Sequence, residues 1–133
     1  MKKLNPGLIT VVFILAASVG SVFAEQIINT PNYVISQPGE YVLTADLTGA
    51  DVVIKIDGTS DVVLDGKNFR LLGTDPGNEK SAGVFVNKSA RVTIKNFSSI
   101  NNSFYGVNVN ESEEVVIQNC VSEKNFDGTR QYE

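Results

Sequence analysis

The chain has 133 residues, a net charge of −4 at pH 7, one cysteine and no histidine. The lack of histidine removes the Ser-His-Asp and Cys-His nucleophile systems and the commonest ligand of transition metals. The acidic balance argues against nucleic acid and anionic membrane surfaces as partners, and a single cysteine permits no internal disulfide.

The first 24 residues have the pattern of a secretory signal peptide. Lys2 and Lys3 precede an apolar run over residues 8–17, and Val22-Phe23-Ala24 resembles a signal-peptidase site. We expect cleavage after Ala24, because the run is short for a membrane span of about 20 residues; a membrane anchor is the alternative. Cleavage leaves 109 residues with a net charge of −6, enough for one domain, and no later run long enough to span a membrane. The expected location is extracytoplasmic: secreted, at the cell surface or in the periplasm.

Residues 25–50 are expected to cap the N-terminal end of the fold. Two short apolar segments, 33–36 and 41–44, flank Pro38-Gly39, a pair typical of a type II turn. They predict either a hairpin or an initial half-coil. A fold built from stacked repeats needs such a cap, because its terminal core must be covered.

Residues 51–128 contain a motif that occurs three times. In each copy, one apolar-x-apolar segment is followed, after a polar turn, by a second. The first segments are Ile54-Lys55-Ile56, Val84-Phe85-Val86 and Val107-Asn108-Val109, and the second are Val62-Val63-Leu64, Val92-Thr93-Ile94 and Val115-Val116-Ile117. The copies are offset by 30 and 23 residues, and an insertion at 74–80 accounts for the longer offset. Strand alternation at this period predicts an all-β solenoid of about three stacked coils.

The turn residues predict which positions lie above one another. Opposite charges are expected to pair between neighbouring levels in two columns, Asp61–Arg91–Glu114 and Lys88–Glu111. A third column, directly after the second segment, contains Gly66, Asn96 and Asn119. We predict a left-handed backbone at this column, since Gly and Asn tolerate that conformation best.

Three runs carry a resemblance to a known family: Gln37-Pro38-Gly39-Glu40-Tyr41-Val42-Leu43, the segment 60–66, and Gly-Val-x-Val-x-x-Ser-x-x-Val-x-Ile-x-Asn at 106–119. They resemble secreted right-handed parallel β-helix proteins of the pectin-lyase-like superfamily. Within it, repeat-rich surface proteins of methanogenic archaea and the NosD-type periplasmic group are the most similar. The resemblance covers residues 35–128 and implies a right-handed parallel β-helix. This scaffold hosts lyases, hydrolases, adhesins and structural proteins, so the resemblance does not choose a function.

The C-terminal end departs from the repeat. Phe126-Asp127-Gly128 matches Phe104-Tyr105-Gly106, but Thr129 and Gln131 then stand where apolar residues are expected. We therefore expect residues 129–133 to form a tail and the last coil to be open, with unpaired backbone and exposed apolar side chains. Two interpretations follow: the chain is a truncated piece of a longer β-helix protein, or the open coil self-associates or docks on another chain.

Carboxylates are the remaining candidates for catalysis. Asp57, Asp61 and Asp65 lie around different corners of one coil, and their expected vertical neighbours are Asn87, Arg91 and Lys95. Neither the carboxylate pair of a glycosidase nor a calcium cage assembles from this set. We predict no catalytic residue, no metal ligand and no cofactor. A copper role, associated with the NosD-type group, would need soft ligands, and Cys120 is expected to be a small buried residue aligned with Phe97.

Outward strand positions predict a binding face. Lys55, Phe85 and Asn108 form one column, and Val63, Thr93 and Val116 form another. Parallel faces of this kind can hold an extended saccharide. Phe85 lies between two inward residues and should point outward, either to stack on a sugar ring or to pack under the 74–80 loop.

These observations together predict a secreted or cell-surface module that is non-catalytic and either structural or carbohydrate-contacting. Its expected partners are polysaccharide or cell-envelope components. Acceptor sequences for N-glycosylation begin at Asn87, Asn101 and Asn110. The alternatives are a fragment of a polysaccharide lyase or hydrolase of the pectin-lyase-like superfamily, and a NosD-like periplasmic copper-accessory protein.

Overall fold

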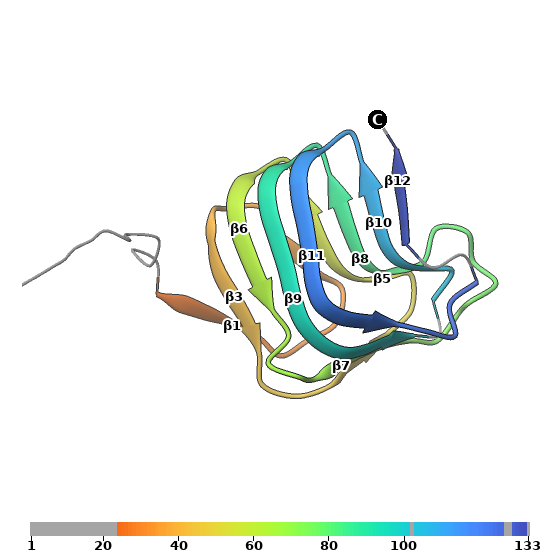
Figure 1. The fold of residues 1–133 in the computed structure, drawn as a ribbon. Coiled ribbons are helices and arrows are strands. Elements are labelled where there is room, and N and C mark those ends of the chain that lie inside the picture. Colours follow the sequence, from red (N-terminus) through yellow and green to blue (C-terminus); the bar gives the residue numbers. More distant parts are fainter. Residues whose placement is uncertain (1–23, 102, 127–128, 133) are drawn as a thin grey trace, which may run out of the picture.

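The computed structural model describes residues 24–101, 103–126 and 129–132, the last of these by their backbone alone. This part of the chain is all-β: it contains twelve strands, arranged in one seven-stranded and one five-stranded sheet (Figure 1). Every strand pair is parallel. The described residues include no helix that is long and apolar enough to span a membrane.

The seven-stranded sheet is organised around one long strand. Its members are β1 (Glu25–Ile28), β3 (Gly39–Leu43), β4 (Leu47–Gly49), β6 (Ser60–Asp65), β7 (Arg70–Gly73), β9 (Ala90–Asn101) and β11 (Glu113–Ser122). Strand β9 pairs with β6 through its first half and with β7 through its second half. Strand β11 runs along the other side of β9.

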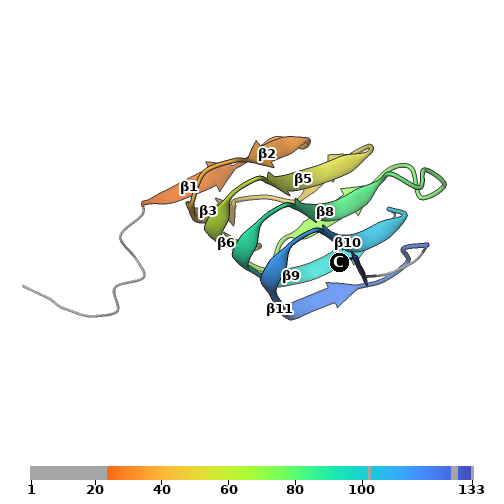
Figure 2. The same ribbon diagram turned by 90° about the horizontal axis from the view of Figure 1, so that it is seen from above.

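The five-stranded sheet contains the other strand of each repeat. Its members are β2 (Tyr33–Ile35), β5 (Val52–Asp57), β8 (Ala82–Asn87), β10 (Tyr105–Asn110) and β12 (Thr129–Tyr132), in the order β12-β10-β8-β5-β2. The chain alternates between the sheets, so that β5 leads to β6, β8 to β9 and β10 to β11 (Figure 2). Residues 129–133 were expected to form a tail; β12 instead continues this sheet by pairing with β10.

The pairing registers confirm the strand columns that the repeat predicts. Val84 pairs with Ile54 on one side and Val107 on the other. In the other sheet, Val92 lies between Val62 and Val115. The inward residues of both sheets form one buried core, which includes the ring of Phe97, 1% exposed. Burial of each such large apolar side chain stabilises the fold by about 1.5–3 kcal/mol.

The hairpin interpretation of residues 33–44 is wrong, because β2 and β3 belong to different sheets. Strand β2 pairs with β5, and β3 pairs with β1 and β6. Both segments have a parallel partner whose inward side chains reach the same core, so each adds to an existing sheet. Ile35 of β2 and Leu43 of β3 are each 1% exposed in that core.

The left-handed prediction holds for Asn96 and Asn119, whose φ angles are 60° and 52°, and is wrong for Gly66. Lys67 and Asn68 adopt the left-handed conformation there instead, with φ of 52° and 67°. Glycine is needed at 66 for space: a Cβ would lie 2.6 Å from Phe97 Cδ1 and 2.7 Å from the backbone oxygen of Asn96.

The turn between the two strands of each repeat contains further left-handed residues that the sequence did not indicate. Two positions per turn have φ between 47° and 63°: Gly58 and Asp61, Lys88 and Arg91, Glu111 and Glu114. Gly58 and Asp61 belong to residue types that favour this conformation, but the other four are Lys, Arg and Glu residues, which are not enriched in it and gave no signal. Hydrogen bonds between the turns of successive repeats stabilise this conformation: Ser89 Oγ accepts from the Thr59 N–H at 3.3 Å, and Ser112 Oγ accepts from the Ser89 N–H at 3.0 Å.

Candidate functional site

The structure confirms the predicted column of Lys55, Phe85 and Asn108. These residues lie side by side on β5, β8 and β10, with Phe85 paired to both of the others. Val84 and Val86, on either side of Phe85, are 0% exposed. Alternation therefore directs Phe85 away from the core, to the outer face of the five-stranded sheet.

A shallow pocket of about 350 Å³ contains all three side chains of this column. Val52, Glu79 and Lys80 complete its lining. The 74–80 loop thus forms one wall, and Phe85 both faces outward and lies beside the loop. The two uses proposed for Phe85 from the sequence are compatible with each other.

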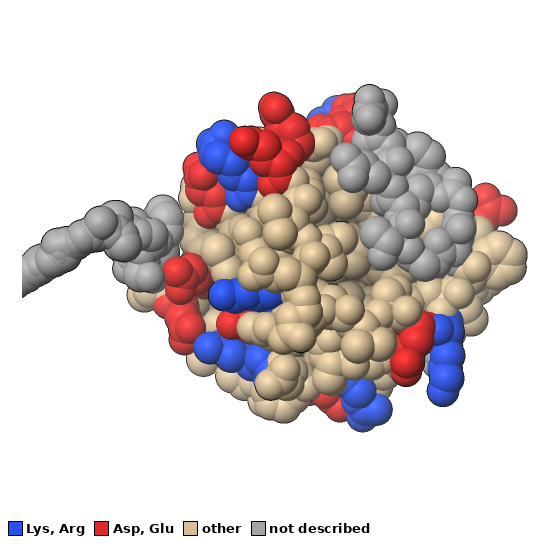
Figure 3. Space-filling model, viewed as in Figure 1, with Lys and Arg blue, Asp and Glu red and all other residues tan. Residues whose placement is uncertain are grey.

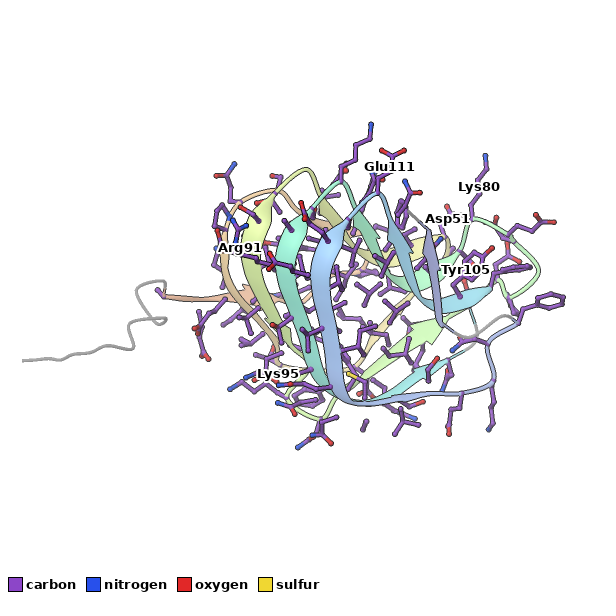
Figure 4. All side chains as sticks on the ribbon, turned by 45° about the horizontal axis from the view of Figure 1, so that its top comes forward. Asp51, Lys80, Arg91, Lys95, Tyr105 and Glu111 are labelled. Carbon is purple, nitrogen blue, oxygen red and sulfur yellow. The ribbon has the colours of Figure 1, made fainter. Side chains whose placement is uncertain are left out.

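Hydrogen bonds hold the 74–80 loop in place beside the sheet. Asn78 Nδ2 donates to Asp51 Oδ1 at 2.6 Å, and the Ser81 N–H donates to the carbonyl of Asn78 at 2.8 Å. Ser81 Oγ also donates to the carbonyl of Asp75 at 2.9 Å. Lys80 extends from this loop (Figure 4) and lines the pocket. The wall of the pocket is therefore formed before a ligand arrives.

The pocket is bordered by a charged pair. Lys55 Nζ lies 3.2 Å from the Asp57 carboxylate and 5.9 Å from the centroid of the Phe85 ring. The hydrogen bond from the Asn87 side chain lowers the pKa of Asp57; burial opposes this shift and Lys55 reinforces it. Asp57 is accordingly a carboxylate at neutral pH, and Lys55 provides a cation over an aromatic ring.

Asn108 contributes an unsatisfied polar atom to this site. Its Oδ1 is buried and has no hydrogen-bond partner among the described residues. An amide group deprived of its hydrogen bond costs about 1–3 kcal/mol. A half-turn of the side-chain amide exchanges the oxygen with the nitrogen, and Asn108 lines the pocket, so this group can offer either an acceptor or a donor there.

A ladder of amide side chains runs beside the pocket. Asn87 Nδ2 donates to Asp57 Oδ1, and Asn110 Nδ2 donates to Asn87 Oδ1, both at 2.8 Å. Two of the three predicted glycosylation sites therefore use their amide in this ladder, and the third, Asn101, donates to Ser99 Oγ at 2.9 Å. Glycosylation at these positions stays a prediction.

The second predicted column lies on the outer face of the seven-stranded sheet. Thr93 pairs with Val63 and Val116, as expected. The charged columns beside it are also confirmed. Arg91 donates to both carboxylate oxygens of Asp61 at 2.7 and 3.1 Å and lies 3.9 Å from Glu114; Lys88 lies 3.9 Å from Glu111. The hydrogen bond from Arg91 lowers the pKa of Asp61.

The three aspartates considered for catalysis have the neighbours expected from the repeat: Asp57 pairs with Asn87, Asp61 binds Arg91, and Asp65 pairs with Lys95. Burial alone would raise the pKa of Asp65, but hydrogen bonds from the Lys67 N–H and the Asn96 side chain give a lowered pKa. In the described part of the chain, no group of three or more His, Cys, Asp or Glu residues could hold a metal ion.

Sequence reasoning missed one charged cluster. A hollow of about 330 Å³ beside β1, β3 and β6 contains the carboxylates of Glu25, Glu40 and Asp65 together with Lys67 and Lys95. Lys67 Nζ lies 3.6 Å from Glu25 and 3.7 Å from Asp65. Only the pairing of β1 with β3 brings Glu25 beside Glu40, and nothing in the repeat predicted that strand.

Cys120 pairs with Phe97, as the repeat predicted. It is half-buried, packs against the core, and its pKa is raised by burial. The sequence led us to expect a buried residue, and the remaining exposure arises because no described strand pairs with the other side of β11.

Comparison of the chain with protein-family models, with curated proteins and with solved structures found no match in any of the three.

Proposed function

We propose that this protein is an extracytoplasmic, right-handed parallel β-helix module that contacts carbohydrate through the pocket around Phe85. Support for the solenoid is the parallel pairing between equivalent strands of successive repeats, with the chain alternating between two sheets. Parallel strands joined by crossover connections are right-handed in nearly all cases. The proposal of export depends on the signal-peptide pattern; residues 1–23 lie outside the described part.

The observation that carries the carbohydrate proposal is the meeting of an aromatic ring and an unsatisfied amide in one pocket. The apolar face of a sugar ring can stack on Phe85, and sugar hydroxyls can hydrogen-bond with Asn108 and with Lys80 on the loop. The column continues along the sheet to Lys55 and Val34. An extended chain would lie along this column and place one ring over Phe85.

A binding role fits the chemistry beside the pocket better than acid catalysis. A glycosidase needs a carboxyl group that keeps its proton near neutral pH. The pKa of Asp57 is lowered by Asn87 and Lys55. The Asp57 carboxylate therefore holds the Lys55 ammonium in position and has no proton to donate at neutral pH.

The test measures binding of the full-length chain to a neutral galactan and to polygalacturonate by affinity electrophoresis and calorimetry. Phe85→Ala should weaken binding about tenfold, which corresponds to 1.4 kcal/mol, and Asn108→Leu should weaken it to a similar extent. Phe126→Ala is the matched control, because Phe126 is 74% exposed and lines no part of this pocket.

Equal losses in Phe85→Ala and Phe126→Ala, or no binding by the unmodified chain to either polymer, would overturn the proposal. The same samples test the enzyme alternative. Release of new reducing ends from either polymer would replace the binding module with a lyase or hydrolase.

A further inference from the structure

The loop that forms one wall of the Phe85 pocket depends on a single half-buried residue. The 74–80 loop protrudes from the side of the molecule, at the right in Figures 1 and 3, and all of its residues are exposed except Asn78. The two residues that follow Asn78, Glu79 and Lys80, line the pocket. An exposed loop has few packing contacts, so hydrogen bonds must fix the position of this wall.

Both ends of the Asn78 side chain take part in one bridge. Its Nδ2 donates to Asp51 Oδ1 at 2.6 Å, and its Oδ1 accepts from the Lys80 N–H at 3.0 Å. The backbone of Asn78 adds two bonds, because its N–H donates to the Asp75 carbonyl at 3.2 Å and its carbonyl accepts from the Ser81 N–H at 2.8 Å. The side-chain amide therefore connects a carboxylate just before β5 to the backbone of Lys80.

Asp51 gives the bridge a fixed attachment point beside the sheet. Its carbonyl accepts from the Ala82 N–H at 2.9 Å, where β5 and β8 begin. Its φ of 54° is a left-handed conformation that aspartate and asparagine adopt more readily than most residues. The acceptor for Asn78 is a carboxylate, and such charge-assisted bonds are roughly twice as strong as those between neutral groups.

The far end of the loop is anchored separately. Ser81 Oγ donates to the Asp75 carbonyl at 2.9 Å and accepts from the Phe104 N–H at 2.8 Å, and the Ser81 carbonyl accepts from the Tyr105 N–H at 3.1 Å. These bonds fix Ser81 against the start of β10. The bond that reaches Lys80 itself comes from the Asn78 side chain.

We propose that Asn78 and Asp51 are positioning residues of the Phe85 pocket. Their hydrogen bond sets how far the loop wall lies from Phe85, and thereby sets the affinity for saccharide. Neither residue lines the pocket, so both act through Glu79 and Lys80, which do. This inference rests on the proposed carbohydrate function and assigns the residues that hold its site in shape.

An exchange of the two side chains tests the inference, with affinity for galactan and polygalacturonate measured by electrophoresis and calorimetry. Asn78→Asp removes the donor and places a second carboxylate against Asp51, so binding should weaken about tenfold. Asp51→Asn should stay within about twofold of the unmodified chain, because an amide oxygen can still accept. The double variant Asp51→Asn/Asn78→Asp restores one donor and one acceptor and keeps the net charge, so it should recover the affinity that Asn78→Asp loses.

Asn125→Asp is the matched control for charge and for general loss of stability. Asn125 Nδ2 donates to the Ile100 carbonyl at 2.7 Å and to Ser122 Oγ at 3.0 Å, and Asn125 lines no part of the pocket. This variant makes the same change in net charge and also removes a donor from a corner of the chain. It should lower Tm and leave the affinity unchanged.

A double-mutant cycle adds a readout that a merely structural role would not move. Because Asn78 acts through the two loop residues in the wall, Asn78→Asp should weaken binding little further in a chain that already carries Glu79→Ala/Lys80→Ala. The same substitution should still lower Tm in that chain. Full additivity of the two effects on affinity would contradict the positioning role.

The outcomes separate this inference from the carbohydrate proposal. Weaker binding by Phe85→Ala together with unchanged binding by Asn78→Asp would overturn the inference alone. So would an exchanged variant that binds as weakly as Asn78→Asp, or equal weakening in Asn125→Asp. No binding by the unmodified chain to either polymer would overturn both proposals.

Discussion

Replacing Gly66 by asparagine should destabilise the protein, although asparagine occupies the same column in the next two repeats. Asn96 and Asn119 adopt a left-handed backbone that asparagine tolerates, whereas Gly66 does not. Any side chain at 66 would place its Cβ 2.6 Å from Phe97 Cδ1 and 2.7 Å from the backbone oxygen of Asn96. The asparagine side chain would therefore clash with these atoms. Its tolerance of the left-handed backbone would bring no benefit, because residue 66 does not adopt that conformation.

The structure sets the expected size of this effect. The backbone oxygen belongs to β9 and cannot move without breaking strand pairing, and Phe97 is 1% exposed with no solvent side toward which to turn. Overpacking of this kind costs about 1–3 kcal/mol. For a domain of this size, a loss of about 1 kcal/mol lowers Tm by roughly 4–8 °C. We therefore expect both Gly66→Ala and Gly66→Asn to melt at least about 5 °C lower.

Thermal and urea unfolding of the full-length chain, followed by circular dichroism, measures this effect. Gly58 is the matched control, since its φ is +63° and a Cβ there meets nothing within 4 Å. Gly58→Asn should be nearly neutral, and Gly58→Ala should cost about 1 kcal/mol from backbone strain. The Gly66→Ala effect should shrink when Phe97 is replaced by leucine. A Gly66→Asn chain as stable as the unmodified protein would refute the steric explanation.

Three further predictions concern side chains along β9 and β11 and the aspartates of the ladders. Asn96→Gly removes the hydrogen bonds to Asp65 and from Asn119 and should lower the unfolding free energy by about 1–2 kcal/mol in urea; Asn96→Ala should cost about 1 kcal/mol more because of the left-handed backbone. Because Asp57 and Asp65 have lowered pKa values in the folded chain, their ionised carboxylates stabilise the fold at pH values above the ordinary aspartate pKa of about 4. This stabilisation is lost as the pH falls through the pKa that each aspartate has in the folded chain. The urea midpoint should accordingly drop as the pH falls below the ordinary aspartate pKa of about 4, and an unchanged drop in Asp57→Asn/Asp65→Asn would contradict this assignment. Because burial raises the pKa of Cys120, its thiol should react with a disulfide reagent at pH 8 more slowly in the folded chain than in urea. Equal rates in the two states would show that folding does not shield the thiol.

The repeat alone was sufficient to predict the strand columns and the residues that face outward from them. A residue that is inward in one repeat must be inward in the next, since side chains alternate along a strand and equivalent strands pair in register. Lys55, Phe85 and Asn108 could therefore be aligned from the sequence, as could Asp61 with Arg91. The alternation of charge along the Asp61–Arg91–Glu114 column could be predicted from the sequence for the same reason.

Features that depend on contacts between distant segments were decided only by the tertiary structure. The 74–80 loop interrupts the repeat, so no column could predict that Glu79 and Lys80 would form a wall of the Phe85 pocket. Strand β1 lies before the repeat, and its place beside β3 depends on an unpaired sheet edge that local sequence does not reveal. The need for glycine at 66 likewise came from the Phe97 ring of the next repeat. Alternation specifies which way a side chain points, and packing decides what it meets there.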